Sequence, residues 1–489
     1  MNLNEILRMV SNRASVAYYD NAGYVTEWKD WYIGYVKKFH DYQIYTGRKF
    51  VPMRRMSLAM AKRVCEDWAN LLINERTDIT LSSEEATNKL QKILEDCRFW
   101  RKANDGIEKT FALGTGAFVV SVEDIDTDDN GDFVSGDSAR VKVSFINAEK
   151  MRPITFEDGD ITECAFVTVG NKKTKIAVHL KDESGNYVIH NIICEGDKED
   201  SLTFNIEDPS QYYVFDTKSK LPWFAAIRPN IANNIDINSP LGVSIFANAI
   251  DILKEVDLIF DSYANEFMLG RKRVFINSRA SVINMSTGEQ QEVFDSNDVA
   301  FYVLPEAEND NGVFIQHDTQ TLRVTDHQAG LQNQLNLLSY ACGFGTNHYK
   351  FDGGSVATAT QIVSENSDLF RNLKKHEIII EEALKTITKA IIYALDVFTS
   401  DYIDPNTNIE IKFDDSIIED KQGEMANDRL DVSMGVMSKA EFRAKWYNED
   451  LETAQRKIDE MNSMTIADDE PYLDEEEEQA AAGEEETAV

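Results

Sequence analysis

A glycine-bearing stretch at residues 343–354, GFGTNHYKFDGG, is one place where the spacing of residues could support chemistry. A glycine-rich loop that opens a helix often cradles phosphate with its backbone amides. These glycines match neither the G-x-x-x-x-G-K-[ST] loop nor a dinucleotide fingerprint, and no β-rich run leads into them. We therefore interpret the stretch as a flexible loop in which Gly343, Gly345, Gly353 and Gly354 supply backbone freedom.

A candidate calcium loop lies at residues 126–137, DTDDNGDFVSGD. Five of its residues occupy EF-hand loop positions, with Asp in place of the usual bidentate Glu: Asp126, Asp128, Asn130, Gly131 and Asp137. The flanking segments are typical of strands, and Asp-Asn-Gly between strands is typical of a hairpin turn. We favour a solvated turn, keep calcium as the alternative, and assign no metal site.

Other candidate catalytic residues lack partners at a useful spacing. HEIII at 376–380 resembles the start of a zinc-binding H-E-x-x-H helix, but Ile380 stands where the second ligand belongs, so we expect His376 on a helix surface. Ser244 in GVSIF lacks the second glycine of a nucleophile elbow. The seven histidines form no short-range cluster, and the five dispersed cysteines are expected to be buried thiols. We expect no catalytic residues, no cofactor and no enzyme activity.

The composition predicts a folded, strongly acidic protein. The chain has 489 residues, of which 43% are hydrophobic, and a net charge of −35. At ~100–200 residues per domain it should form two to four units. Eleven acids and no base lie in residues 466–489, so we expect this tail not to pack, and 24 excess negative charges remain elsewhere. Tight nucleic-acid binding is disfavoured, because it needs clustered Lys and Arg. No apolar run approaches the ~20 residues of a membrane span, and we expect a soluble intracellular product.

Periodicity predicts an α+β fold. Residues 1–112 should be helical, including the segments TEWKDWYIGYVKKFHDYQIY and RRMSLAMAKRVCEDWANLLINERTDIT. Residues 117–230 carry short β-branched runs separated by Gly, Asp and Asn, which predict strands in hairpins. Ser239 and Pro240 are typical of a helix start, so we expect a helix over 241–269 of about 44 Å.

The second half predicts helices around a small β-rich insertion. The insertion covers about 270–322, and a helix is expected over 325–342. After the glycine-bearing loop, an apolar stripe predicts a helix over 356–398, about 65 Å long if straight. A strand, NIEIKF, and further helices should follow Pro405. Basic clusters are few: Arg271, Lys272 and Arg273 where the first long helix meets the insertion, and Arg371, Lys374 and Lys375 on the last long helix.

With these elements in this order, the chain resembles the portal proteins of tailed bacteriophages, of the siphophage type. WYIGYVKKFHDYQIYTG and MAKRVCEDWANLLINE look like that family's N-terminal signature. FALGTGAFVV, SPLGVSIFANAIDILKEVDLIFDSYANEFMLGRKRVFI and ATATQIVSENSDLFRNLKKHE resemble its later blocks. The similarity extends to about residue 445.

The resemblance implies a portal fold with long stem and spine helices. Its regions would be the wing at 1–235, stem helices at 236–269 and 323–342, the clip at 270–322, the tunnel loop at 343–355, the spine helix at 356–398, the crown at 399–465, and the acidic tail at 466–489.

The same resemblance implies a ring of about twelve copies around a channel for double-stranded DNA. Thr346, Asn347, His348, Tyr349 and Lys350 would face the DNA at the tunnel loop. The expected partners are the large terminase that drives packaging, a head–tail adaptor protein, and the major capsid and scaffolding proteins, with no membrane. The expected location is the portal vertex of the virion, and the host cytoplasm during assembly.

Two other classes of function are kept open. The long helices could build another structural or scaffolding protein without a DNA channel, or the chain could be a cytosolic enzyme whose site is assembled from distant residues. Only the portal interpretation predicts a ring with an opening wide enough for a duplex.

Overall fold

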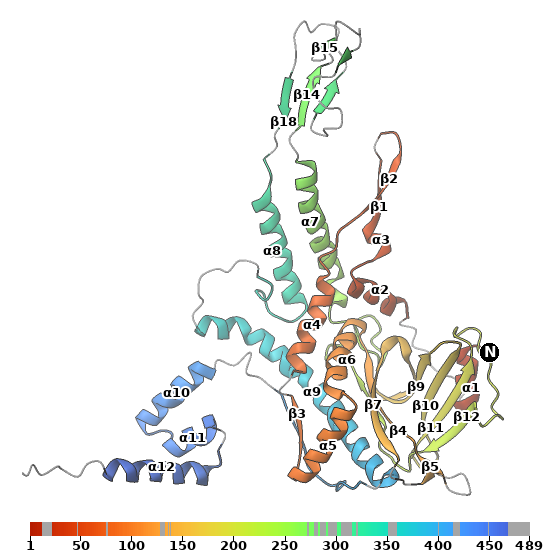
Figure 1. The fold of residues 1–489 in the computed structure, drawn as a ribbon, viewed down its shortest axis with the longest axis vertical. Helices are drawn as coiled ribbons and strands as arrows, with labels where there is room; N and C mark the ends of the chain where they lie inside the picture. The colour runs from red at the N-terminus through yellow and green to blue at the C-terminus, as the bar shows by residue number, and fades with distance from the viewer. Residues whose placement is uncertain are drawn as a thin grey trace, which may run out of the picture. The chain divides into compact units, whose positions relative to one another are not determined.

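The computed structural model describes residues 1–11, 22–45, 47–74, 77–127, 133–134, 136, 138–270, 273–277, 282–283, 290–291, 301–304, 315–318, 321–350, 359–399, 401–413, 421–447 and 449–467. Two compact units make up the chain (Figure 1). The larger contains Met1–Val356 and Ser364–Asp414, and the smaller contains Ala357–Val363 and Asp415–Val489. The mixture of helices and sheets confirms the α+β prediction.

A five-stranded antiparallel sheet in the order β12-β11-β10-β9-β8 dominates the β-rich part of the larger unit. Its strands are β8 Met151–Glu157, β9 Asp160–Val169, β10 Lys173–Lys181, β11 Tyr187–Glu195 and β12 Tyr212–Asp216. A second sheet, β13-β4-β7, contains β4 Gly116–Glu123, β7 Arg140–Asn147 and β13 Phe224–Ile227. The strands predicted within 117–230 are therefore confirmed.

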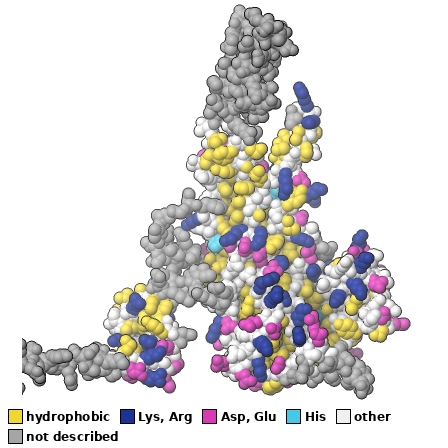
Figure 2. All heavy atoms as spheres, in the orientation of Figure 1, with side chains coloured by type: hydrophobic (Ala, Val, Ile, Leu, Met, Phe, Trp, Pro, Cys, Tyr) yellow, Lys and Arg dark blue, Asp and Glu magenta, His cyan; other side chains and the backbone are white. Residues whose placement is uncertain are grey.

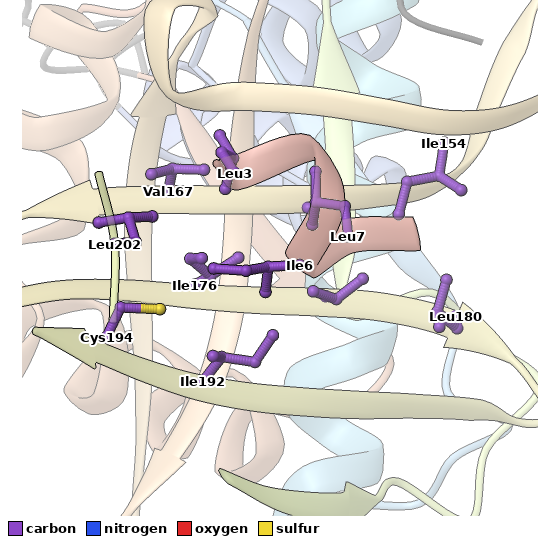
Figure 3. Close-up of a cluster of buried hydrophobic side chains, with 12 residues drawn as sticks. Leu3, Ile6, Leu7, Ile154, Val167, Ile176, Leu180, Ile192, Cys194 and Leu202 are labelled. Carbon is purple, nitrogen blue, oxygen red and sulfur yellow. The ribbon is translucent and has the colours of Figure 1, made fainter. Parts of the chain in front are cut away.

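Helix α1, Leu3–Ser11, covers one face of the five-stranded sheet. Asn2 begins the helix in a reciprocal capping arrangement, because its Oδ1 accepts from Glu5 N at 2.8 Å while Asn2 N donates to the Glu5 carboxylate at 2.9 Å. Leu3, Ile6 and Leu7 then lie on one helix face and pack onto the strands with Val167, Ile176 and Ile192 among others (Figure 3). The opposite face of the sheet packs against the second sheet through Phe166 and Phe224.

The helical part of the larger unit contains α2 Ala22–Ile33, α3 Lys37–His40, α4 Met60–Leu72, α5 Glu84–Asp96 and α6 Phe99–Leu113. Three stretches depart from the predicted helices. Residues Asp41–Tyr45 and Phe50–Arg54 form the antiparallel hairpin β1–β2, and β3, Asp78–Leu81, pairs with β19, Ile409–Lys412. The helical prediction is wrong at these strands because their backbone hydrogen bonds are made to partner strands, which are distant in sequence for β3.

The first long helix is shorter than predicted. A 3-10 turn, η2 at Ala247–Ala249, precedes α7, which runs over Ile250–Leu269 and is about 30 Å long. Ser239 caps a turn instead of a helix, since its Oγ accepts from Leu241 N at 3.2 Å. The predicted start was wrong because Gly242 approaches the backbone of Gly114 so closely that the chain is held in turns there.

The remaining long helices match their predicted positions. Helix α8 covers Val324–Ala341 and packs along α7, and α9 covers Ala359–Phe398. Between α7 and α8, strand β14 (Arg273–Asn277) pairs with β17 (Phe301–Leu304) and β18 (Ile315–Asp318), which confirms a β-rich insertion. Two short pairs complete the strands: β15 Val282–Ile283 with β16 Gln290–Gln291, and β5 Asp126–Thr127 with β6 Phe133–Val134.

The smaller unit contains α10 Lys421–Met434, α11 Lys439–Tyr447 and α12 Leu451–Ala467. Ser438 and Glu441 form a capping box at the start of α11, and Trp446 Nε1 donates to Asp428 of α10 at 2.8 Å. The predicted crown began at 399, but residues 401–413 lie in the larger unit because β19 pairs with β3. The acidic tail lies outside the described residues beyond 467.

Three further expectations can be compared with the described residues. All five cysteines are free and buried, as predicted. Strands β5 and β6 confirm a hairpin around the candidate calcium loop, whose turn lies outside the described residues. None of the described helices is long and apolar enough to cross a membrane.

Candidate functional site

Residues 343–350, here called the anchor segment, leave the end of α8 in a fixed conformation. Gly343 N donates to Tyr340 O at 3.1 Å, and Phe344 N donates to Ser339 O at 2.9 Å. This pair of bonds is the Schellman ending of a helix, which needs a left-handed residue directly after the cap. Gly343 supplies it at φ 88°, and Gly345 has φ 85°. The two glycines set the path of the segment, because other residues adopt such angles only with strain.

Aromatic stacking holds the anchor segment against α4. Phe344 is 3% exposed and stacks on Trp68 of α4 with ring centroids 4.7 Å apart. On its other side it stacks on His348 at 4.3 Å. The Trp68 Nε1 donates to Cys342 O at 3.0 Å, so the same side chain also fixes the backbone at the end of α8. Two buried aromatic residues therefore join α4 to the segment.

Polar contacts fix the far end of the anchor segment. The Tyr349 hydroxyl donates to Asp67 Oδ2 at 3.0 Å, and Asp67 Oδ1 pairs with Arg63 at 2.8 Å. Gln332 Nε2 of α8 donates to Tyr349 O at 2.7 Å. Burial and the nearby Asp67 carboxylate both raise the pKa of Tyr349. The hydroxyl is therefore a neutral donor at physiological pH.

His376 of α9 lies beneath this anchor rather than on the helix surface. It is 3% exposed, its ring lies 4.8 Å from Trp68 and 5.1 Å from Phe111, and its Nδ1 accepts from Asn230 N at 3.0 Å. Burial, assisted by Lys375, lowers the pKa of His376 to about 3, so the ring is neutral. The surface prediction was wrong because the partner side chains come from α4 and α6, which local periodicity does not bring to His376.

The predicted site residues fall into two groups. Thr346, His348 and Lys350 are exposed to solvent, whereas Asn347 and Tyr349 are half-buried. Tyr349 is part of the attachment to α4, which the sequence did not indicate. Arg271, Lys272, Gly353 and Gly354 lie outside the described residues, and Arg273 begins β14 with no described side chain. Contact of residues 346–350 with DNA stays a prediction, as do the hinge role of Gly353 and Gly354 and the basic cluster at 271–273.

Sequence reasoning missed the residues of α4 that hold the segment. Trp68 lies in a segment that was predicted to be helical, but nothing in its spacing indicated residue 344 as its partner. The useful local signal was Gly343 directly after an apolar helix, which is typical of a Schellman ending.

An ion pair joins α7 to α8 at the end nearest the β-rich insertion. Arg323 donates from Nε to Glu266 Oε1 at 3.1 Å and from an Nη to Oε2 at 2.8 Å. His327 Nε2 lies 3.7 Å from the same carboxylate. Hydrogen bonds from Arg323 lower the pKa of Glu266 to about 2, so the pair is ionised at neutral pH. The two helices are thus aligned where the chain enters and leaves the insertion.

The described residues offer no assembled metal or thiol chemistry. Among them, no group of three His, Cys, Asp or Glu residues could hold a metal ion. Burial raises the pKa of Cys164 and Cys342 to about 12, so these thiols are protonated and unreactive. The arrangement described above holds residues 343–350 between α4 and α8.

Comparison with known proteins gives the family. The family model for phage portal proteins described as SPP1 Gp6-like matches residues 18–468, and this chain belongs to that family. It is a portal protein, a structural component of the head–tail connector at the portal vertex of the virion. A solved structure of the neck of a native GTA particle, computed with C12 symmetry, is similar over 90% of this chain and 97% of that chain, with 8% identity and a TM-score of 0.43. A search of curated proteins found no match.

Proposed function

We propose that about twelve copies of this chain form a ring whose central channel carries double-stranded DNA during packaging and ejection. The observation that carries this proposal is the match of the portal family to residues 18–468, which covers almost the whole chain. In the host cytoplasm the ring would join the scaffolding and major capsid proteins during assembly. It would then dock the large terminase, and later the head–tail adaptor.

The helices and strands of the chain can be assigned to the regions of a portal. Residues 1–235 would form the wing, α7 and α8 the stem, and 270–322 the clip. Helix α9 would be the spine, and the helices after residue 420 the crown. The stem assignment is supported by the pairing of α7 with α8 and by the Glu266–Arg323 ion pair at their shared end.

The anchor segment would hold the tunnel loop at a constant position in the channel. Its aromatic and polar attachments to α4 support a DNA contact made by a fixed ring of side chains. Lys350 is exposed at the end of the segment, so each copy would present one positive charge there. Contacts of this kind with phosphates are weak and salt-dependent, which would let DNA slide past.

Charge should make assembly of the ring sensitive to salt. Each copy has a net charge of −35, so neighbouring copies repel one another at long range. Salt screens this repulsion over about 10 Å at 0.1 M. We therefore expect rings to form more readily at moderate salt than at low salt.

Imaging of the purified protein tests the proposal directly. Negative-stain images and native mass measurements at moderate salt should show closed rings with an opening wide enough for a duplex. Packaging assays with Lys350→Ala should then show impaired DNA entry with intact rings, whereas Lys173→Ala, which removes an exposed lysine of β10, should package normally. Monomers or dimers at high concentration, or rings without an opening, would exclude the channel.

A further inference from the structure

The hairpin β1–β2, residues 41–54 and here called the arm, is too exposed to be stable alone. Its five cross-strand pairs run from Asp41–Arg54 to Tyr45–Phe50. In the larger unit, the strands contact each other extensively and otherwise mainly touch α3. A two-stranded hairpin in water is marginally stable at best, and a third surface is needed to cover it. The arm therefore calls for a partner.

One face of the arm is entirely apolar. Side chains directly opposite each other share a face, so the register places Tyr42, Ile44, Val51 and Met53 together. Ile44 is 44% exposed, and the other three are half-buried. At the tip, Tyr45 and Phe50 contact each other at 5.1 Å and are 59% and 65% exposed. An apolar surface of this kind is typical of an interaction site.

The base of the arm is fixed to α7, which sets its direction. Asp257 Oδ1 accepts from Leu58 N at 2.8 Å, and its Oδ2 lies 3.1 Å from Nε2 of buried His40. One turn further along α7, Asp261 accepts from Met56 N at 3.0 Å. These bonds hold the residues at both ends of the hairpin against the stem. The strands extend beyond them in the same direction as α7 (Figure 1).

The charge of the arm is opposite to that of the chain. Residues 36–58 contain six Lys or Arg and one Asp, in a protein of net charge −35. Helices α7 and α8 together contain six Asp or Glu and one Lys. Figure 2 shows Lys and Arg at the tip of the arm above its hydrophobic side chains. Complementary charges of this kind guide association and fix its register.

The arm is long enough to reach the exposed apolar residues at the end of α7. Five strand residues extend about 17 Å, whereas α7 continues only about 12 Å beyond Asp261. The arm therefore spans the last turns of α7, where Phe267 and Met268 are 45% and 55% exposed. Although the base of the arm is bound to its own stem, Ile44 on the apolar face remains 44% exposed.

We propose that the arm of each copy packs its apolar face against the last two turns of α7 in the neighbouring copy, covering Phe267 and Met268. This inference rests on the proposed ring, in which copies are related by rotation and equivalent residues keep the same height along the axis. The arm supplies both apolar area and positive charge to an interface between acidic stems. It offsets part of the repulsion between copies.

Cross-linking between differently tagged chains tests the contact. One chain carries Ile44→Cys, and a second chain of different mass carries Met268→Cys. Since all five native cysteines are buried, a short bis-maleimide should join only the introduced thiols. Rings assembled from both chains should give a mixed covalent dimer at least tenfold above a control in which Val169→Cys, on the 44% exposed end of β9, replaces Met268→Cys.

The other outcomes of the cross-linking experiment distinguish a failure of the proposed arm contact from a failure of the proposed ring. Rings that form without the mixed dimer would overturn the arm contact and leave the ring intact. A link formed only within one chain carrying both substitutions would show that the arm folds onto its own stem. Protection of Ile44→Cys from labelling by duplex DNA would make the arm a nucleic-acid contact instead. Absence of rings would reject the ring and the arm together. As a second measure, Ile44→Ser with Val51→Ser should weaken the interface, so that rings of the variant need a higher salt concentration to stay assembled than rings of the native chain.

Discussion

Removal of one hydroxyl group should loosen the anchor segment without unfolding the protein. Tyr349→Phe keeps the ring beside Phe344 but deletes the hydrogen bond to Asp67, whose length is 3.0 Å. The Schellman ending, the stack of Phe344 on Trp68, and the bond from Gln332 to the backbone of residue 349 are all retained. The substitution therefore tests one attachment of the segment in isolation.

The free energy lost in Tyr349→Phe depends on the hydrogen-bond acceptor, which is the charged carboxylate of Asp67. A hydrogen bond to a charged group contributes about 1.5–3 kcal/mol. We expect the lower end, about 1.5 kcal/mol, because Asp67 keeps its ion pair with Arg63, whose side chain is 58% exposed and screened by solvent. A change of 1.4 kcal/mol is tenfold in an equilibrium constant. Opening of the segment should thus become about ten times more frequent.

Amide hydrogen exchange measures this opening. The Phe344 amide, which donates to Ser339 O, should exchange about tenfold faster in Tyr349→Phe, while amides in α4 keep their native rates. Tyr340→Phe is the matched control, since Tyr340 is 66% exposed on the neighbouring helix and should change nothing. Unchanged exchange of the Phe344 amide in Tyr349→Phe would refute the role given to Asp67.

Three further substitutions test the fold. Burial lowers the pKa of His179 to about 3, so below pH 6.5 the unfolded chain binds a proton at this residue that the folded chain does not. The folded state therefore loses stability as the pH falls from 6.5 toward 3. Because His179→Phe removes this titration, it should recover about 2 kcal/mol of unfolding free energy at pH 5, measured by urea titration. Gly242→Ala would place its Cβ 2.2 Å from Gly114 O and should destabilise by about 1–3 kcal/mol, whereas Gly23→Ala, with open space around it, should not lower the melting temperature. Glu266→Gln removes an ionic partner of Arg323, and trypsin should cleave there faster with little change in global unfolding.

Local pattern predicted the elements whose stability is local. The apolar stripe of α9 lies at helical spacing, and Leu373, Ile380 and Leu384 on it are buried. The strands of the five-stranded sheet were likewise visible as β-branched runs between turn residues. Prediction failed at α7, whose expected start at Ser239 looked like a helix cap but lies where Gly242 meets the backbone of Gly114.

The candidate site could be predicted only in part. Gly343 and Gly345 were found from composition, and both have the left-handed angles that favour glycine. The attachment of Tyr349 to Asp67 joins residues 282 positions apart, and the burial of His376 depends on Trp68 and Phe111. No local spacing encodes such pairs, because they arise when α4, α6 and α9 pack together.

The sequence by itself determined the acidic charge, the order of helices and β-rich segments, and the resemblance to portal proteins that the family match supports. These follow from composition and from hydrophobic spacing over a few turns. Only the tertiary structure decided that the loop after α8 is fixed to α4, that residues 41–54 form an exposed arm, and that α7 begins at Ile250. The physical reason is that each depends on hydrogen bonds and packing between segments far apart in the chain.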